Sequence, residues 1–319
     1  MLRWLMVLTM GCGLLAAAPP IPVILDTDIG DDIDDALALA LALQSPELEV
    51  RAVVTVLQHR ERRADLAWKI LELYGRTEVA VGQGAEQPLM TRPRTSVVRQ
   101  TVALGPEERM PEGRRRNGIG LIVETLMSSR EKITWLAYGP LTNVALALKA
   151  EPRIAAKIER LVLMNGVFFQ GPRLEYNTER DPEAAAIVFS SGLPITTVGL
   201  DVTMKCRLEP EHMKRFEASS VPAVKFLWEL IRIWQEGKPE RRPVLHDPLA
   251  VAVTFRPELI RTATGRVEIE TRGEPGRTYG MCILRPDPNG PVRVASEVEA
   301  GEFVKLFVER VASAPRGRS

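Results

Sequence analysis

The chain has 319 residues, of which 45% are hydrophobic and 26% charged, so it can bury a sizeable core in one large domain or two small ones. Its formal net charge of +1 gives no reason to expect nucleic acid or an anionic membrane surface as a partner. The cysteines Cys12, Cys206 and Cys282 form no CxxC pair and no metal-like spacing, so the sequence leaves their pairing open.

The N-terminal segment has the order of a secretory signal peptide. Arg3 is an early cation, residues 4–15 are apolar, and small residues follow at 16–18. The apolar run is too short for a stable membrane span. A buried N-terminal helix is the alternative, and Cys12 after Gly11 is a weak lipoprotein signal. We therefore expect residues 1–18 to be a signal peptide and residues 19–319 to be exported to the periplasm or the extracellular space.

Strand and helix patterns alternate along most of the chain. Short apolar or β-branched runs predict strands, and runs with apolar residues at helical spacing predict helices. This alternation is typical of a largely parallel α/β sheet. The predicted strands are residues 21–25, 49–57, 78–82, 132–139, 158–166 and 194–200, and the predicted helices are 36–43, 62–75, 141–152, 182–190, 210–236 and 246–255.

Two regions depart from this alternation. Residues 83–117 carry four prolines, several glycines and the basic run GRRRNG, and we expect a long surface loop of the kind that often carries function. The tail predicts a small hairpin over 266–280 and a closing helix over 299–311. Because no internal repeat or linker divides the chain, we expect one domain with a single open, mostly parallel sheet flanked by helices.

The most unusual stretch is DTDIGDDIDD, residues 26–35, which holds six aspartates. Two carboxylates about 5 Å apart repel by roughly 3 kcal/mol at an effective dielectric near 20. Helix capping explains two or three of the later aspartates, but not Asp26 and Asp28 at the exit of the first strand. The excess indicates a hard cation, for which Ca²⁺ suits an irregular loop better than Mg²⁺. Such a cation can acidify a water or hold sugar hydroxyls, so the turn indicates hydrolysis at a sugar or a phosphate.

A second group of polar residues lies far along the chain, at the start of a predicted helix. His246 and Asp247 are adjacent, and Pro248 and an apolar run follow them. An aspartate before a proline at the first helical position is also a common N-cap. Taken alone, this dipeptide is better explained by capping than by chemistry.

Together these stretches resemble the inosine-uridine preferring nucleoside hydrolase family, over residues 21–311. ILDTDIGDDIDDALAL looks like the N-terminal aspartate signature of that family, with two more residues between the glycine and the closing aspartate pair than the shorter family form has. Further blocks follow in family order: LAYGPLTNVALAL (136–148), LVLMNG (161–166), EYNTERDPEAAAIV (175–188), VGLDVT (198–203) and HDPLAVA (246–252).

The resemblance implies calcium-dependent hydrolysis of the N-glycosidic bond of ribonucleosides, giving ribose and free base, by a homodimer or homotetramer. It implies that Asp28 is the general base and that His246 lies near the leaving base and protonates it. The ligands of Ca²⁺ would be Asp28, Asp35, Asp247 and the backbone carbonyl of Tyr138, and the ribose would be held by Asp34, Glu175 and Asn177. Met164 and Asn165 follow a strand at the same edge of the sheet, and we expect them to line the pocket.

The sequence departs from the family pattern at the pocket wall. TVLQHRER places His59 where the family usually has an asparagine, and the usual histidine-glycine loop after the third strand is absent. These differences bear on substrate identity more than on the calcium site. Trp234 is a candidate for stacking on the base, although core packing is the commoner role of a tryptophan on an amphipathic helix. Asp31 and Asp32 belong to the extra residues of the longer signature and have no assigned role.

Two other functions remain open. VILDTD also looks like the aspartyl-nucleophile turn of haloacid-dehalogenase-like phosphatases, which would make Asp26 a nucleophile but leaves the later blocks unexplained. The altered loops and the export signal are also compatible with an exported calcium-containing protein that binds a nucleoside or ribosyl compound with reduced or no catalysis. Phosphate loops of the GxGxxG or Walker type are missing from the sequence, so a nucleotide cofactor is not indicated.

Overall fold

The computed structural model of the protein describes residues 18–90, 95–171 and 173–316, so the predicted signal peptide lies outside the described part except for Ala18. The fold is built on a ten-stranded sheet of order β4-β3-β2-β1-β5-β6-β7-β10-β8-β9. β8 is antiparallel to both of its neighbours and the other pairs are parallel. The strands are β1 Ile21–Thr27, β2 Leu48–Thr55, β3 Ala80–Gln83, β4 Arg115–Asn117, β5 Ile133–Ala137, β6 Ile158–Leu163, β7 Ile195–Thr197, β8 Ile260–Ile269, β9 Cys282–Pro286 and β10 Val292–Val298.

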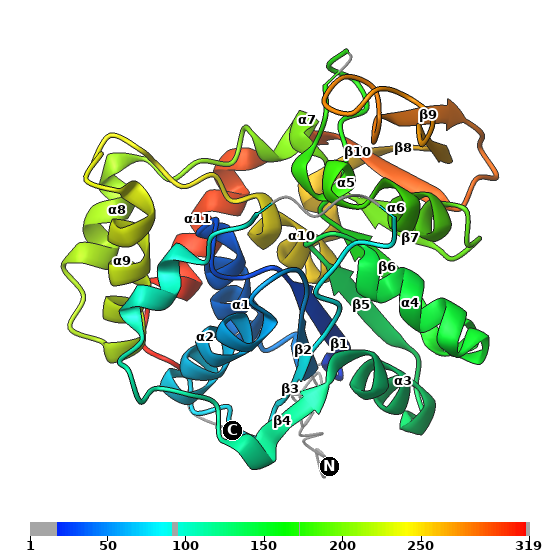
Figure 1. Ribbon diagram of the computed structural model, residues 1–319. Helices are drawn as coiled ribbons and strands as arrows, with labels where there is room; N and C mark the ends of the chain where they lie inside the picture. Colours follow the sequence, from blue (N-terminus) through cyan, green and yellow to red (C-terminus); the bar gives the residue numbers. More distant parts are fainter. Residues whose placement is uncertain (1–17, 91–94, 172, 317–319) are drawn as a thin grey trace, which may run out of the picture.

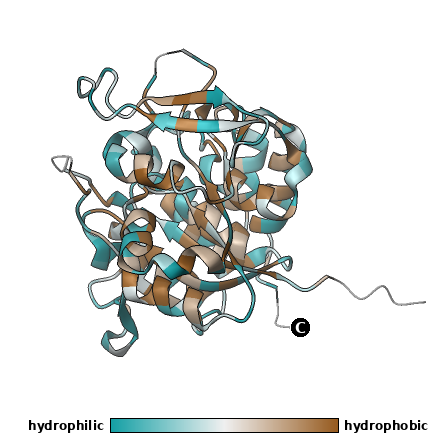
Figure 2. Ribbon diagram, turned by 90° about the vertical axis from the view of Figure 1, so that its right-hand side faces the viewer, coloured by the Kyte–Doolittle hydropathy of each residue, from teal (hydrophilic) through white to brown (hydrophobic). Residues whose placement is uncertain are grey.

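Helices cover both faces of the sheet (Figure 1). Side chains alternate across a strand, so Val23 and Leu25 of β1 pack into one apolar cluster and Ile24 into the other. One face carries α1 Asp34–Gln44, α2 Arg60–Leu73, α7 Leu200–Thr203, α8 Pro210–Glu217, α9 Pro222–Gln235, α10 His246–Phe255 and α11 Ala300–Val311. The other face carries α3 Gly118–Ser128, α4 Thr142–Ala150 and α6 Pro182–Phe189. Figure 2 shows hydrophobic segments gathered in the middle of the molecule, between these layers.

The helix that follows the acidic turn is buried throughout. Every residue of α1, Asp34–Gln44, is buried, as expected for a helix that is apolar on all sides and packs within the core. The acidic turn connects β1 to α1 and therefore lies at the carboxyl edge of the sheet. Its strand, β1, lies inside the sheet next to β5. This is the edge at which ligands bind in open α/β folds.

The tail differs from the prediction. The segment predicted as a hairpin, 266–280, contains only the end of β8 and a turn, and the returning strand is β9 at Cys282–Pro286. A further strand, β10, was missed, and it joins the tail to the main sheet through a parallel pairing with β7. The tail signal was weak because β8 and β9 lie at the edge of the sheet and mix exposed and half-buried positions.

The predicted long loop, residues 83–117, contains three short elements among its described residues: the 3-10 helices η1 Arg99–Ala103 and η2 Glu112–Arg114, and the edge strand β4. The remaining helical segments are η3 Pro152–Lys157, α5 Tyr176–Arg180 and η4 Pro257–Leu259. None of the helices in the described residues is long and apolar enough to cross a membrane.

Candidate metal-binding active site

The aspartates of the acidic turn do not cap α1. The N-cap of this helix is Ile33, which makes no side-chain capping bond. Asp32 accepts a hydrogen bond from the neighbouring Ile33 N–H at 2.7 Å, and Asp34 Oδ2 accepts one from the backbone N–H of Asp247 on α10 at 3.2 Å. The capping explanation therefore fails for Asp34, whose carboxylate instead faces the start of a second helix.

Three carboxylates meet where α1 and α10 begin. Asp34, Asp35 and Asp247 each place a ligand atom within 4.8 Å of those of the other two, and each is only 3% exposed. Burial raises the pKa of all three carboxyl groups well above the usual range, and the charges of the neighbouring aspartates raise it further. Because a buried charge needs a counter-charge, this donor set fits a hard divalent cation.

These three carboxylates lie in the wall of a cavity of about 320 Å³. All four predicted calcium ligands, Asp28, Asp35, Tyr138 and Asp247, border it. The three closely spaced carboxylates include Asp34 and not Asp28. The family resemblance assigns Asp34 to the ribose and Asp28 to the metal. The carbonyl of Tyr138 accepts a hydrogen bond from Asn177 Nδ2 at 3.0 Å, so a ligand and a sugar-binding candidate are already in contact.

Asp28 lies near the three clustered carboxylates and next to a buried arginine, Arg63. Its backbone carbonyl accepts a hydrogen bond from Arg63 Nη1, and the same nitrogen donates to the carbonyl of Ile29 at 2.9 Å. Burial raises the pKa of the Asp28 carboxyl to about 6, and the charge of Arg63 limits the rise. Its side chain lines the cavity, as a general base must.

The residues predicted to hold the sugar come mainly from α5 and the preceding loop. Glu175 caps α5 by accepting hydrogen bonds from the N–H groups of Asn177 and Thr178 at 2.7 and 3.0 Å, and it also accepts one from Gly166 at 3.1 Å. Burial raises the pKa of Glu175, although these hydrogen bonds oppose the rise. Glu175 and Asn177 line the cavity, and so does Met164.

Asn165 does not line the cavity, contrary to the prediction. It is fully buried, its Nδ2 donates to the Met164 carbonyl at 2.6 Å, and its Oδ1 accepts from Thr178 Oγ1 at 3.2 Å. Its amide therefore fastens the end of β6 to α5. Asn165 follows Met164 directly in the sequence, but only the Met164 side chain lines the cavity.

His246 lies at the first position of α10 and lines the cavity. Its Nδ1 is 2.7 Å from Thr203 Oγ1 on α7. Burial lowers the pKa of the imidazole to about 4, and the charges of Arg207 and Arg173 lower it further, so the ring is neutral at neutral pH. This position therefore offers a hydrogen-bonding imidazole and not a pre-formed imidazolium.

The cavity is also lined by two arginines that the sequence did not reveal, Arg99 and Arg241. Arg99 of η1 makes an ion pair with Glu236 (Nη1 to Oε1, 2.6 Å), and the Arg241 guanidinium stacks over Trp234 at 4.3 Å from the ring centroid. Both arginines and Trp234 line the cavity. The other lining residues without a predicted role are Asp31, Asp32, Tyr176 and Leu200. The only sequence signal for Arg99 was its place in the long loop.

Asp26 does not line the cavity. It is 1% exposed, and its Oδ1 accepts a hydrogen bond from Asn143 Nδ2 at 2.8 Å. Burial raises its pKa to about 8, so the carboxyl is mostly protonated at neutral pH. A phosphatase nucleophile must be charged and accessible, and Asp26 is neither.

Fold and cavity together define an α/β enzyme whose carboxylate-rich site suits a hard cation and a hydroxyl-rich substrate. The chain belongs to the inosine-uridine preferring nucleoside hydrolase family, whose model matches residues 23–305. It is therefore a hydrolase that acts on nucleosides, an N-glycosidase.

Relatives and solved structures agree with this assignment. The chain is 36% identical over 314 residues to the pyrimidine-specific ribonucleoside hydrolase RihA of Escherichia coli, covering 91% of this chain and 98% of the relative. A plant nucleoside hydrolase superposes with a TM-score of 0.80 at 26% identity, covering 92% of this chain and all of that one. The purine-preferring ribonucleoside hydrolase from Gardnerella vaginalis gives 0.76 at 28% identity, covering 91% and 98%.

Proposed function

We propose that this enzyme hydrolyses ribonucleosides to ribose and free base with Ca²⁺ as its resident metal. The observation that carries the metal proposal is the buried trio Asp34, Asp35 and Asp247 on the wall of the cavity. All candidate ligand atoms are oxygens, which favours Ca²⁺ or Mg²⁺, and the irregular turn between β1 and α1 favours Ca²⁺.

Asp28, Asp35, Asp247 and the carbonyl oxygen of Tyr138 would hold the ion. When bound, the cation lowers the pKa of the attacking water and fixes the ribose hydroxyls. Asp34, whose carboxylate has an oxygen within 4.8 Å of ligand atoms of Asp35 and Asp247, would bind a ribose hydroxyl.

The remaining steps belong to the protein. The carboxylate of Asp28 takes the proton of the attacking water. Glu175 and Asn177 hold the far side of the sugar from α5, and buried carboxylates stabilise the positive charge that develops on the ribose as the glycosidic bond breaks. Because His246 Nδ1 is engaged by Thr203, its Nε2 is the ring nitrogen left to donate to the departing base. Trp234 lines the cavity and would provide an aromatic surface on which that base stacks.

Substrate preference, assembly and location are further parts of the proposal. The 36%-identical relatives are named pyrimidine-specific, so we propose uridine and cytidine as the first substrates to test. We also propose that the chain forms a homodimer or homotetramer and is exported after loss of residues 1–18. Size-exclusion chromatography with light scattering would measure the assembly, and the N-terminal sequence of the secreted protein would test the export.

The test is base release from a nucleoside panel by the protein lacking residues 1–18. Base release from uridine, cytidine, inosine and adenosine is measured for the parent protein with Ca²⁺ and with a chelator. The same panel is measured for the Asp28→Asn variant with Ca²⁺. Release that needs Ca²⁺ and Asp28 supports the proposal and ranks the bases. Tight nucleoside binding without turnover would instead support the exported binding protein.

A further inference from the structure

Gln100, the second residue of η1, joins the long loop to the acidic turn. The residue is fully buried, and its Nε2 donates to the backbone carbonyls of Asp31 and Asp32 at 3.2 and 2.5 Å. Its backbone N–H donates to the carbonyl of Gly30 at 3.1 Å. One residue of η1 therefore holds three successive carbonyls of the acidic turn.

Residues 30–32, the segment that Gln100 holds, belong to neither β1 nor α1. Gly30 has a φ of 121°, in the left-handed region that favours glycine. A Cβ at Gly30 would lie 3.3 Å from Cγ1 of Val98, which directly precedes η1. The turn and the start of η1 are therefore in close contact as well as hydrogen-bonded.

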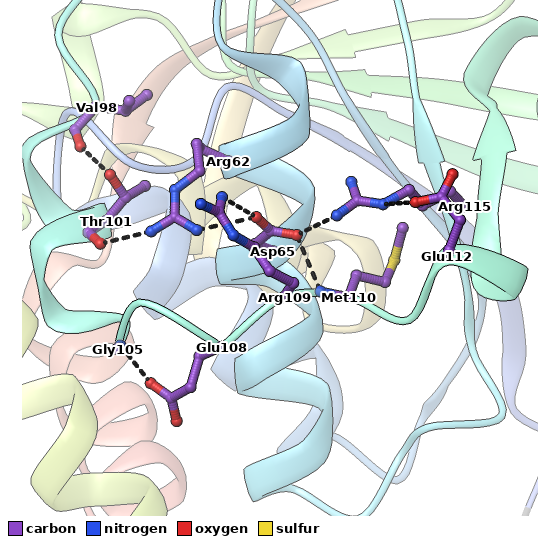
Figure 3. Close-up of polar contacts among 10 residues, drawn as sticks. All are labelled: Arg62, Asp65, Val98, Thr101, Gly105, Glu108, Arg109, Met110, Glu112 and Arg115. Atoms are coloured by element: carbon purple, nitrogen blue, oxygen red, sulfur yellow. Dashed lines mark hydrogen bonds and ion pairs between the residues drawn. The ribbon is translucent and has the colours of Figure 1, made fainter.

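η1 is itself anchored to α2 (Figure 3). The carbonyl of Thr101 accepts a hydrogen bond from Arg62 Nη2 at 3.2 Å, and Arg62 Nη1 pairs with Asp65 at 3.1 Å. The Asp65 side chain is fully buried and also binds the later part of the loop, through Arg109 at 3.2 Å and the N–H of Met110 at 2.9 Å. Because α2 holds the loop at several points, η1 is a firm support for the acidic turn.

The supported segment carries two carboxylates of the cavity wall. Asp31 is half-buried and Asp32 is exposed, and both line the active-site cavity. Asp32 interacts with the indole N–H of Trp234, the candidate for stacking on the base. A charged carboxylate only accepts hydrogen bonds, and the hydroxyl groups of a ribose and the N–H groups of a base are donors. The two carboxylates are thus accessible acceptors for a nucleoside.

We propose that Gln100 is a positioning residue of the nucleoside site. It fixes the backbone of residues 30–32, and this keeps the carboxylates of Asp31 and Asp32 where they accept hydrogen bonds from the substrate, beside Trp234. Small displacements of such groups weaken their contacts with a substrate even when the groups themselves are intact. The predicted metal ligands lie outside residues 30–32, so Gln100 governs the affinity for the nucleoside and not the affinity for the metal.

The experiment measures kcat and KM for the best nucleoside of the panel in the parent and in Gln100→Met. Methionine has a similar length and no N–H donor. It also removes Gln100 Oε1, which is buried without a donor in the described part of the chain, so the fold should tolerate the change. We expect KM to rise about five- to tenfold, the effect of one or two lost hydrogen bonds, with kcat and the affinity for Ca²⁺ within about twofold of the parent.

Thr101→Val is the matched control. It removes a hydrogen bond within η1, from Thr101 Oγ1 to the Val98 carbonyl at 2.7 Å, and no hydrogen bond that the structure describes to the acidic turn. Its KM should equal that of the parent. In a background that carries Asp31→Ala and Asp32→Ala, Gln100→Met should change KM by less than about twofold, because the carboxylates that Gln100 places are gone.

Three results overturn the proposal: an unchanged KM in Gln100→Met, an equal rise of KM in Thr101→Val, or an undiminished effect of Gln100→Met in the Asp31→Ala, Asp32→Ala background. If thermal melting shows that Gln100→Met does not fold, Gln100→Asn, whose amide is one methylene shorter, replaces it. If the parent binds nucleosides without turnover, the dissociation constant replaces KM. Each variant is compared with the parent in the metal that supports the parent, so activity without Ca²⁺ would contradict the proposed metal and not the role of Gln100.

Discussion

Replacing Asp247 by asparagine should have opposite effects on the stability of the metal-free and the metal-bound protein. The ligand atoms of Asp34, Asp35 and Asp247 lie within 4.8 Å of one another. At an effective dielectric near 20, one charged pair at that distance repels by about 3 kcal/mol. In the metal-free protein, Asp247→Asn removes one charge from two such pairs. It removes no hydrogen bond that the structure describes on this carboxylate, since the contact with Asp34 comes from the backbone N–H of residue 247.

We therefore expect the metal-free variant to be more stable than the metal-free parent, by about 1–3 kcal/mol after partial protonation of the parent relieves some repulsion. With Ca²⁺ the order should reverse, because the ion stabilises the folded state by RT ln(1 + [L]/Kd) and the variant binds it more weakly. Thermal or urea unfolding of both proteins, with chelator and with excess Ca²⁺, measures all four values. If the substitution destabilises the protein equally in both conditions, the cluster is a structural network and not a metal site.

Three further predictions follow from single residues. Asp28→Ala should fold but lose about 10²–10⁴-fold in kcat, the range for a general base, and a loss confined to KM would contradict that role. Arg63→Met should lower the free energy of unfolding by more than about 3 kcal/mol, because it leaves the buried carbonyls of Asp28 and Ile29 and the half-buried carbonyl of Gln58 without this donor. A change under about 1 kcal/mol in urea unfolding would refute this. Burial raises the pKa of the Cys206 thiol to about 12, so the folded state keeps a proton that the unfolded state releases above about pH 9, and stability should fall as pH rises from 9 towards 12. Between about pH 9 and 12, the free energy of unfolding should fall less steeply with pH in Cys206→Ala, by up to about 1.4 kcal/mol per pH unit. Equal slopes in the two proteins would show that the Cys206 thiol does not cause the loss of stability.

Much of the fold could be predicted from local patterns. The sequence predicted α10 with the bounds that the structure has, His246–Phe255, because an N-terminal Asp-Pro pair and an uninterrupted apolar run mark both of its ends. β1 and the acidic turn were equally clear, since a short apolar run leads directly into the aspartates. β10 and the true return of the tail hairpin were missed, because their strand character depends on pairing with β7 and β8.

The site residues that lie in recognisable sequence blocks were more predictable than the arginines Arg99 and Arg241. Five of the lining aspartates sit in one signature. The blocks at 136–148, 161–166, 175–188, 198–203 and 246–252 bring most of the other lining residues to the same sheet edge. Arg99 begins the short 3-10 helix η1, Arg241 lies in a loop, and both pair with Glu236, so no sequence period indicates that they lie together. Asn165 was misplaced because sequence proximity to Met164 says nothing about which of two neighbours points into the cavity.

A metal titration of the chelated protein tests whether a Ca²⁺ ion held by Asp28, Asp35, Asp247 and the Tyr138 carbonyl activates hydrolysis. Ca²⁺ is added in steps while both metal binding and the initial rate of base release from uridine, or from the best substrate of the panel, are followed. We expect no activity without the ion, a rate that rises in proportion to bound Ca²⁺, and saturation when each chain holds one ion. Full activity in the chelated protein, or binding of Ca²⁺ with no change in rate, would contradict it.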